Sequence, residues 1–122
     1  MKRRYVQPES NAASALDALC DALCALRGRE EMAAFLRDLC TPAELEAMSD
    51  RWRVVAPLTS GIAYRSIHDQ SGVSATTIGR VARCLNEGEG GYRLAARRLA
   101  EAGDPSFSQM LKDGRPANDE RH

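Results

Sequence analysis

Residues 64–92 read YRSIHDQSGVSATTIGRVARCLNEGEGGY, and this stretch decides the fold. Gly72 divides its first part into two segments that can each form a short helix, one over 64–71 and one over about 74–86. Ser74 is a good N-cap for the second segment, because a serine hydroxyl accepts a hydrogen bond from a free backbone N–H of the first helical turn. Two helices joined by a glycine turn of three or four residues predict a helix-turn-helix.

The second predicted helix has two chemically different faces at about 100° per residue. The apolar face carries Ala75, Ile78, Ala82 and Leu85, with Val81 at its edge. The opposite face carries Thr76, Gly79, Arg80 and Arg83. Small residues let a helix enter a major groove closely, and arginine pairs with phosphates and with guanine edges. The polar face therefore favours duplex DNA as a partner, although an ordinary amphipathic helix with a solvated arginine face has the same pattern.

Composition describes an ordinary globular chain with a local basic region. The 122 residues suit one domain, 43% are hydrophobic, 28% are charged, and the formal net charge is zero. Between Arg51 and Arg83 there are five arginines and one acid, Asp69. A basic face of this kind is the electrostatic footprint of phosphate binding. No apolar run reaches about 18 residues and no secretory signal stands out, so we expect no membrane span and a cytoplasmic protein.

The remaining sequence predicts further helices and no strand. Apolar residues recur at close to a 3.6 period before Gly28 and again over 29–40, and a Thr-Pro-Ala-Glu start opens a third helix at Thr41. Pro57 is expected to kink or loosen the end of that third helix. We expect an all-α chain organised as a flexible arm over 1–8, one domain over 9–103 that contains a helix-turn-helix at about 64–86, and a partly disordered tail over 104–122.

Catalytic and metal chemistry find little support. The cysteines are Cys20, Cys24, Cys40 and Cys84. Cys20 and Cys24 share a helical face, which allows a metal or redox site, but there is no CxxC and no histidine nearby; small buried hydrophobes are the favoured interpretation. The sequence holds no nucleophile–base set, no paired carboxylates in a pocket context and no phosphate-cradling loop, so we predict no catalytic residues, no metal and no cofactor.

Two segments carry a family resemblance: CTPAELEAMSDRWRVVAPLTSG at 40–61 and YRSIHDQSGVSATTIGRVARCLNEGEGGYRLA at 64–95. They resemble the Trp-repressor-like superfamily, and the RCLNEGEGGY ending is most similar to its YerC/YecD branch. The resemblance implies a six-helix, all-α fold that forms an intertwined homodimer. In such a dimer two helix-turn-helix heads meet successive major grooves, an arrangement for which the Trp repressor is a standard example.

The resemblance also implies site residues. The base-contacting positions of the family match Ala75, Thr76 and Gly79, with Arg65 and His68 from the first helix. With the helix start and the arginine face, the predicted DNA-binding set is Arg65, His68, Ser74, Ala75, Thr76, Gly79, Arg80 and Arg83. Because Gly79 has no side chain to contact a base, we expect water or DNA shape to carry much of the sequence reading.

A small-molecule effector site is implied in the same way. The family's ligand pocket matches Thr41, Arg51, Arg80, Val81 and Cys84. The two arginines suit a small carboxylate, because a guanidinium pairs with a carboxylate through two hydrogen bonds. Val81 adds bulk where an indole ring would lie and Cys84 is a poor polar partner, so L-tryptophan is not the expected ligand. A structural ion pair or a phosphate contact is an equally good interpretation of Arg51.

Two functional hypotheses remain from the sequence. The first is a dimeric, sequence-specific, DNA-binding transcription regulator. The second is a helical protein-interaction module that keeps the fold without specific DNA reading, which the zero net charge, His68 and Gln70 favour.

Overall fold

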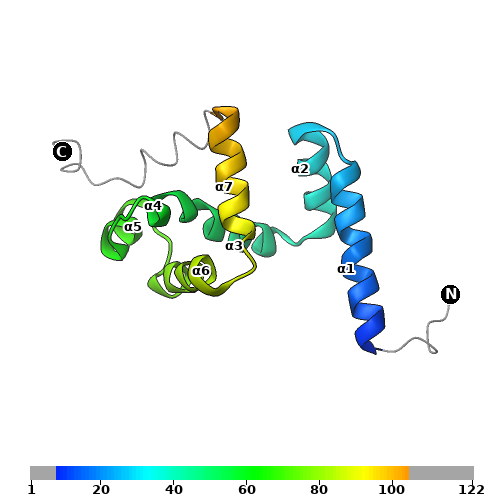
Figure 1. Cartoon of the computed structure of the whole chain (residues 1–122), viewed down its shortest axis with the longest axis horizontal. Coiled ribbons are helices and arrows are strands. Elements are labelled where there is room, and N and C mark those ends of the chain that lie inside the picture. Colours follow the sequence, from blue (N-terminus) through cyan, green and yellow to red (C-terminus); the bar gives the residue numbers. More distant parts are fainter. Residues whose placement is uncertain (1–7, 105–122) are drawn as a thin grey trace. The chain divides into compact units, whose positions relative to one another are not determined.

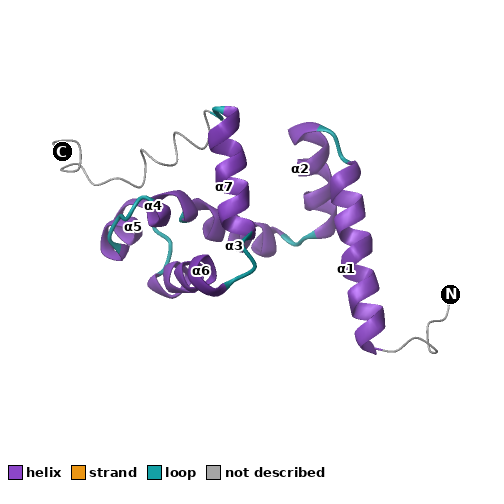
Figure 2. Ribbon diagram, viewed as in Figure 1, coloured by secondary structure: helices purple, strands orange, loops and turns teal. Residues whose placement is uncertain are grey.

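The computed structural model describes residues 8–104, and this part of the chain is entirely helical apart from turns (Figures 1 and 2). Its elements are α1 (Pro8–Ala25), α2 (Gly28–Leu39), α3 (Pro42–Arg53), α4 (Val55–Thr59), α5 (Tyr64–Ser71), α6 (Ala75–Glu87) and α7 (Gly91–Ala102). The all-α prediction is confirmed. The predicted arm over 1–8 and the predicted tail over 104–122 fall almost entirely outside the described residues.

The described residues hold seven helices where six were expected, because the third predicted helix is divided at Val54. Pro57 accounts for the division. It has no N–H to donate to the carbonyl of Arg53, and its ring crowds that carbonyl. Leu58 resumes the helical pattern by donating to the Val54 carbonyl at 3.1 Å. The proline thus ends α3 one turn upstream, where a looser last turn was expected.

The chain forms two compact units with a boundary between Pro42 and Ala43. In the first unit, no described side chain of α1 or α2 is fully buried. The less exposed residues of α1 are Leu19, Ala22 and Leu23, and Leu26 directly after the helix is also half-buried. Cys20 and Cys24 are exposed, so the expectation that they are buried is wrong within this chain. Their i, i+4 spacing places both on one exposed face of α1.

The second unit is built around the helix-turn-helix. Its core consists of Val54, Val55, Ile67, Val73, Ile78 and Val81. Partly buried Trp52, Leu58, Ile62, Leu85, Tyr92 and Ala96 pack against this core. Trp52 is thus half-buried on the outer layer of this core. Helices α5 and α6 contact each other, and α4 contacts both of them as well as α7 (Figure 1).

The glycines and aromatic residue of the NEGEGGY segment explain how the chain passes from α6 to α7. A Cβ atom on Gly88 would lie 2.5 Å from the carbonyl oxygen of Cys84, so this position excludes larger residues. Gly90 has a φ of 87°, which L residues with a side chain rarely adopt. Tyr92 then brings its ring to 6.4 Å from that of Trp52. Arg93 Nε donates to the Leu85 carbonyl at 2.9 Å, which satisfies a carbonyl at the open end of α6.

Candidate nucleic-acid interface

The turn between α5 and α6 is held by a small network of hydrogen bonds. Gly72 has a φ of 77° and its N–H donates to the His68 carbonyl at 2.9 Å, which closes α5. The Ser71 hydroxyl donates to the Ile67 carbonyl and accepts from the Val73 N–H at 3.1 Å. These bonds fix the angle at which the chain leaves α5, because each one satisfies a backbone group at the turn.

Two longer side chains strengthen the same turn. His68 Nδ1 lies 2.8 Å from the Val73 carbonyl. A carbonyl only accepts, so Nδ1 carries the proton of this bond. Arg53 Nη1 donates to the Ser71 carbonyl at 3.0 Å, which connects the end of α3 to the C-terminal end of α5. A cation at that end also interacts favourably with the helix dipole. The helix-turn-helix is thus rigid at its corner.

Ser74 caps α6 as the sequence predicts. Its hydroxyl accepts a hydrogen bond from the Thr77 N–H at 3.1 Å and lies 3.1 Å from the Thr77 hydroxyl. Ser74 itself has extended backbone geometry, as an N-cap residue should.

We expect Ser74→Ala to lower the free energy of unfolding by about 1 kcal/mol, because one N–H at the start of α6 loses its acceptor. Urea unfolding of both proteins at equal protomer concentration measures this change. Ser74→Asp restores an acceptor and should recover most of the loss. Equal stability of the wild type and Ser74→Ala would show that the cap contributes nothing.

The outer face of α6 carries the residues that were predicted to meet DNA. Thr76, Arg80 and Arg83 are exposed, and Gly79 is half-buried. A Cβ atom on Gly79 would meet nothing within 4 Å, so no neighbour in the chain requires glycine there. The other side of α6 is anchored in the core by Ile78, which is fully buried.

The apolar face of α6 is rotated relative to the prediction. Val81 was expected at the edge of this face, but it is fully buried at the centre of the core. Ala75 was expected on the apolar face, but it is exposed. The core residues of α4, α5 and the turn meet α6 on the side of Val81, which is why Ala75 remains outside.

The first helix presents Arg65 and His68, both exposed, and the acids of the two helices are Asp69 and Glu87, also exposed. Arginine therefore exceeds acid over α5 and α6. The structure leaves all eight predicted DNA-binding residues at least partly accessible, on the two helices and at the cap between them.

The residues of the predicted effector pocket are in different environments. Arg51 on α3 and Cys84 on α6 are half-buried, and Arg80 is exposed. Val81 is 0% exposed, so it offers no surface to a ligand from this chain. Thr41 lies before the unit boundary, in the N-terminal unit. Val81 is the fully buried member of this set.

Three residues of this site were not predicted from the sequence: Arg53, Ser71 and Arg93. Each uses its side chain to bond a backbone group at a helix end or turn. The only signal in the sequence is proximity to a helix end, which does not identify the partner when it lies 18 residues away, as it does for Arg53.

Metal and membrane features are not found in the part of the chain that the structure describes. Over residues 8–104, no three potential ligands among His, Cys, Asp and Glu gather closely enough to hold a metal ion. No helix in that part has the length and apolar character needed to cross a membrane.

Comparisons with known proteins agree with this architecture. The Trp repressor protein family matches residues 14–100. The uncharacterised protein YerC of Bacillus subtilis (strain 168) is 37% identical over 94 residues, which is 77% of this chain and 90% of YerC. A crystal structure of a candidate Trp repressor from Staphylococcus aureus superposes with a TM-score of 0.70 at 38% identity, covering 78% of this chain and 95% of that one. The chain therefore belongs to the Trp repressor family, in the branch that includes YerC.

Proposed function

We propose that this protein is a sequence-specific, DNA-binding transcription regulator that acts as a homodimer. One observation carries the proposal. Thr76, Arg80 and Arg83 form an exposed face of α6, and none of their side chains has a hydrogen bond or ion pair with another described residue. Their helix is fixed to the body by the buried side chains on its other side. Free guanidinium groups on a rigid helix are suited to phosphates and base edges.

The arrangement supports different roles for α5 and α6 in DNA binding. The second helix enters the major groove with its N-terminal half, where Ala75, Thr76 and Gly79 present little bulk. Arg80 and Arg83 neutralise phosphates or pair with guanine. Arg65 on the first helix holds the DNA backbone. Since few of these side chains can read bases directly, DNA shape and bridging water carry much of the specificity.

Exposed apolar side chains support the homodimer. Leu16 is 60% exposed, Leu39 is 51% exposed and Met48 is 39% exposed. Neither α2 nor α3 has a fully buried residue. Amphipathic helices of this length depend on tertiary packing for stability, so a second chain is the natural cover. Light scattering coupled to gel filtration should give twice the 13.3 kDa chain mass, and a monomer mass would contradict the dimer.

Salt dependence tests the DNA-binding proposal. The affinity for duplex DNA, measured by fluorescence anisotropy, should fall steeply as salt rises, because each neutralised phosphate contributes about 0.9 to the slope of log K against log salt. The second hypothesis, a helical protein-interaction module, predicts no DNA retention even at low salt. A single stable protein partner recovered together with that result would favour it.

Gly79 provides a separable prediction. Gly79→Ala should raise the free energy of unfolding by about 0.8–1.0 kcal/mol, because alanine is the better helix former and its methyl group meets open space. The same methyl group projects from the proposed DNA face, so we expect weaker DNA binding.

Thermal unfolding and anisotropy on the same samples measure both effects. Gly91→Ala is the matched control, because a Cβ atom there also meets nothing within 4 Å and the residue begins α7. It should leave DNA affinity unchanged. If Gly79→Ala binds DNA as tightly as the wild type, no close approach occurs at this position.

An effector remains part of the proposal. A small carboxylate held by Arg51 and Arg80 is the form that the family resemblance suggests. Val81 is buried, so the guanidiniums of Arg51 and Arg80 are the groups that would bind the carboxylate. Arg51→Gln and Arg80→Gln each remove one of these two groups.

A further inference from the structure

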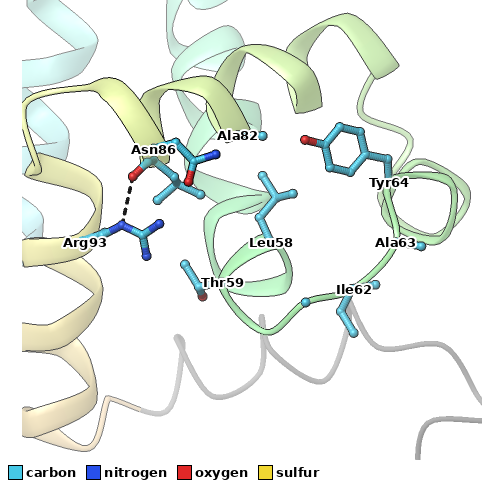
Figure 3. Close-up of a pocket in the computed structure, with 10 residues that line it drawn as sticks. Leu58, Thr59, Ile62, Ala63, Tyr64, Ala82, Asn86 and Arg93 are labelled. Carbon is cyan, nitrogen blue, oxygen red and sulfur yellow. Dashed lines mark hydrogen bonds between the residues drawn. The ribbon is translucent and has the colours of Figure 1, made fainter.

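A cavity of about 340 Å³ lies on the side of the helix-turn-helix unit formed by α4, the α4–α5 link, the second half of α6 and the start of α7 (Figure 3). Its principal lining residues are Leu58, Ile62, Tyr64, Ala82, Asn86 and Arg93. None of the residues predicted for the effector pocket lines it. It is therefore a second candidate ligand site.

The cavity is lined by polar groups that can form hydrogen bonds with a ligand. Among the described residues 8–104, Arg93 is the only Lys, Arg, Asp or Glu that lines it. Its Nε bonds the Leu85 carbonyl at 2.9 Å, which fixes the guanidinium and leaves its four terminal N–H donors. The Asn86 amide and the Tyr64 hydroxyl have no hydrogen-bond partner among the described residues. In Figure 3 the Tyr64 ring lies across the cavity from Arg93 and Asn86.

Besides Thr59, whose hydroxyl donates to the Ala56 carbonyl at 2.9 Å, the remaining side chains of the wall are apolar and several belong to the outer layer of the core. Leu58, Ile62 and Leu85 pack against the buried cluster and are themselves half-buried. Ala82 is also half-buried, and its small side chain leaves space in the cavity beside α6. An apolar group that covered these side chains would be favourable, because it would remove more of their surface from water.

We propose that this cavity binds a small amphipathic carboxylate, with its carboxylate on Arg93 and its apolar part on Leu58, Ile62 and Leu85. A fixed guanidinium selects a planar anion that can accept two parallel hydrogen bonds. The volume is at the lower end of the range for small-molecule sites, which limits the ligand to about the size of an amino acid.

The site leaves the outer face of α6 free. Ala82 and Leu85 lie on a different side of the helix from Thr76, Arg80 and Arg83, so a bound ligand would connect α6 to α4 and α7 without covering the proposed DNA face. The inference does not rest on DNA binding, and it is tested on the full-length protein without DNA.

The test is an amide NMR titration with 3-phenylpropionate, which joins an aromatic ring to a carboxylate through two methylenes. We expect shifts of amides near residues 58–64, 82–86 and 91–94. The uncharged analogue 3-phenylpropanamide should bind at least about tenfold more weakly, because charged hydrogen bonds contribute more than neutral ones.

Two variants test the site by different changes. Arg93→Gln removes the charge, and Ala82→Leu fills the cavity while keeping Arg93 and a good helix former. Each should weaken binding at least about tenfold. Arg98→Gln, which removes an exposed arginine of the same helix α7, should bind as the wild type does. If Arg93→Gln disturbs the fold, the peak dispersion of its amide NMR spectrum reveals this. The binding measured for Ala82→Leu then tests the site.

Three results would overturn the site: no saturable shift at probe concentrations on the order of 10 mM, shifts near Thr41, Arg51 and Arg80 with none near residues 58–64 and 91–94, or unchanged affinity in Ala82→Leu. Loss of binding in Arg51→Gln and Arg80→Gln with normal binding in Arg93→Gln would assign the carboxylate to the pocket that the family resemblance implies.

Discussion

Replacing Arg80 and Arg83 together by glutamine is expected to weaken duplex binding by at least about a hundredfold at physiological salt. Both guanidiniums are exposed on α6 and have no partner among the described residues, so their loss would remove the proposed contacts to DNA without breaking contacts in the fold. In a symmetric dimer each substitution acts twice. If all four groups contact phosphates, the slope of log K against log salt should become shallower by up to about four. Anisotropy titrations over a range of salt measure both quantities.

Arg98→Gln is the matched control for this result. Arg98 is an exposed arginine on α7, outside the helix-turn-helix, and its loss changes net charge without touching the proposed face. We expect less than about a threefold change in affinity from this substitution, because exposed charges away from an interface are largely screened. Equal losses from Arg98→Gln and from a single substitution at Arg80 or Arg83 would show that only overall charge matters.

Removing the core contact beneath the same helix should have the largest effect on stability. Ile78 is 0% exposed and belongs to the cluster that joins α6 to α4, α5 and the turn. Ile78→Ala should lower the free energy of unfolding by about 2–5 kcal/mol, because the substitution removes buried methyl and methylene groups and leaves a cavity. Urea unfolding at fixed protomer concentration measures it, because formation of the proposed dimer would make apparent stability depend on concentration.

Thr76→Ala serves as the comparison for Ile78→Ala. Thr76 lies two residues away on the exposed side of α6, so its substitution should change stability by no more than about 0.5 kcal/mol while it reduces DNA affinity. The two variants therefore separate folding from binding on one helix. A stability loss in Thr76→Ala as large as that in Ile78→Ala would contradict the assignment of the two faces.

The helix-turn-helix was predictable from the sequence because its signals are local. Gly72 marks the turn, Ser74 supplies the cap, and α5 has the predicted bounds of 64–71. The exposure of Thr76, Arg80 and Arg83 also follows from helical periodicity alone.

The exact core face of α6 was less predictable. Periodicity places Ala75 on the apolar face and Val81 only at its edge, but packing against Val54, Val55 and Ile67 buries Val81 and leaves Ala75 exposed. The division of the third helix at Val54 was missed for a related reason. The sequence shows that Pro57 disturbs the helix, but the position of the break depends on the unbonded carbonyl of Arg53, one turn earlier.

The long-range contacts that complete the site could not be predicted from spacing. Arg53 was expected only as part of a basic surface, yet it bonds the Ser71 carbonyl. No role was predicted for Arg93, yet its side chain bonds the Leu85 carbonyl at the end of α6 and lines the cavity. Both side chains act on backbone groups brought near by the fold, and neither partner is marked by its residue type.

Selection from a random pool of duplex DNA with the full-length protein tests the central claim most directly. A dimer with two reading heads should recover a motif of two inverted half-sites whose centres lie about 34–36 Å apart, or one helical turn. The Arg80→Gln, Arg83→Gln double variant should recover no motif under the same conditions. A wild-type pool with no common motif, or the same motif enriched by the double variant, would contradict a DNA-reading role for the outer face of α6.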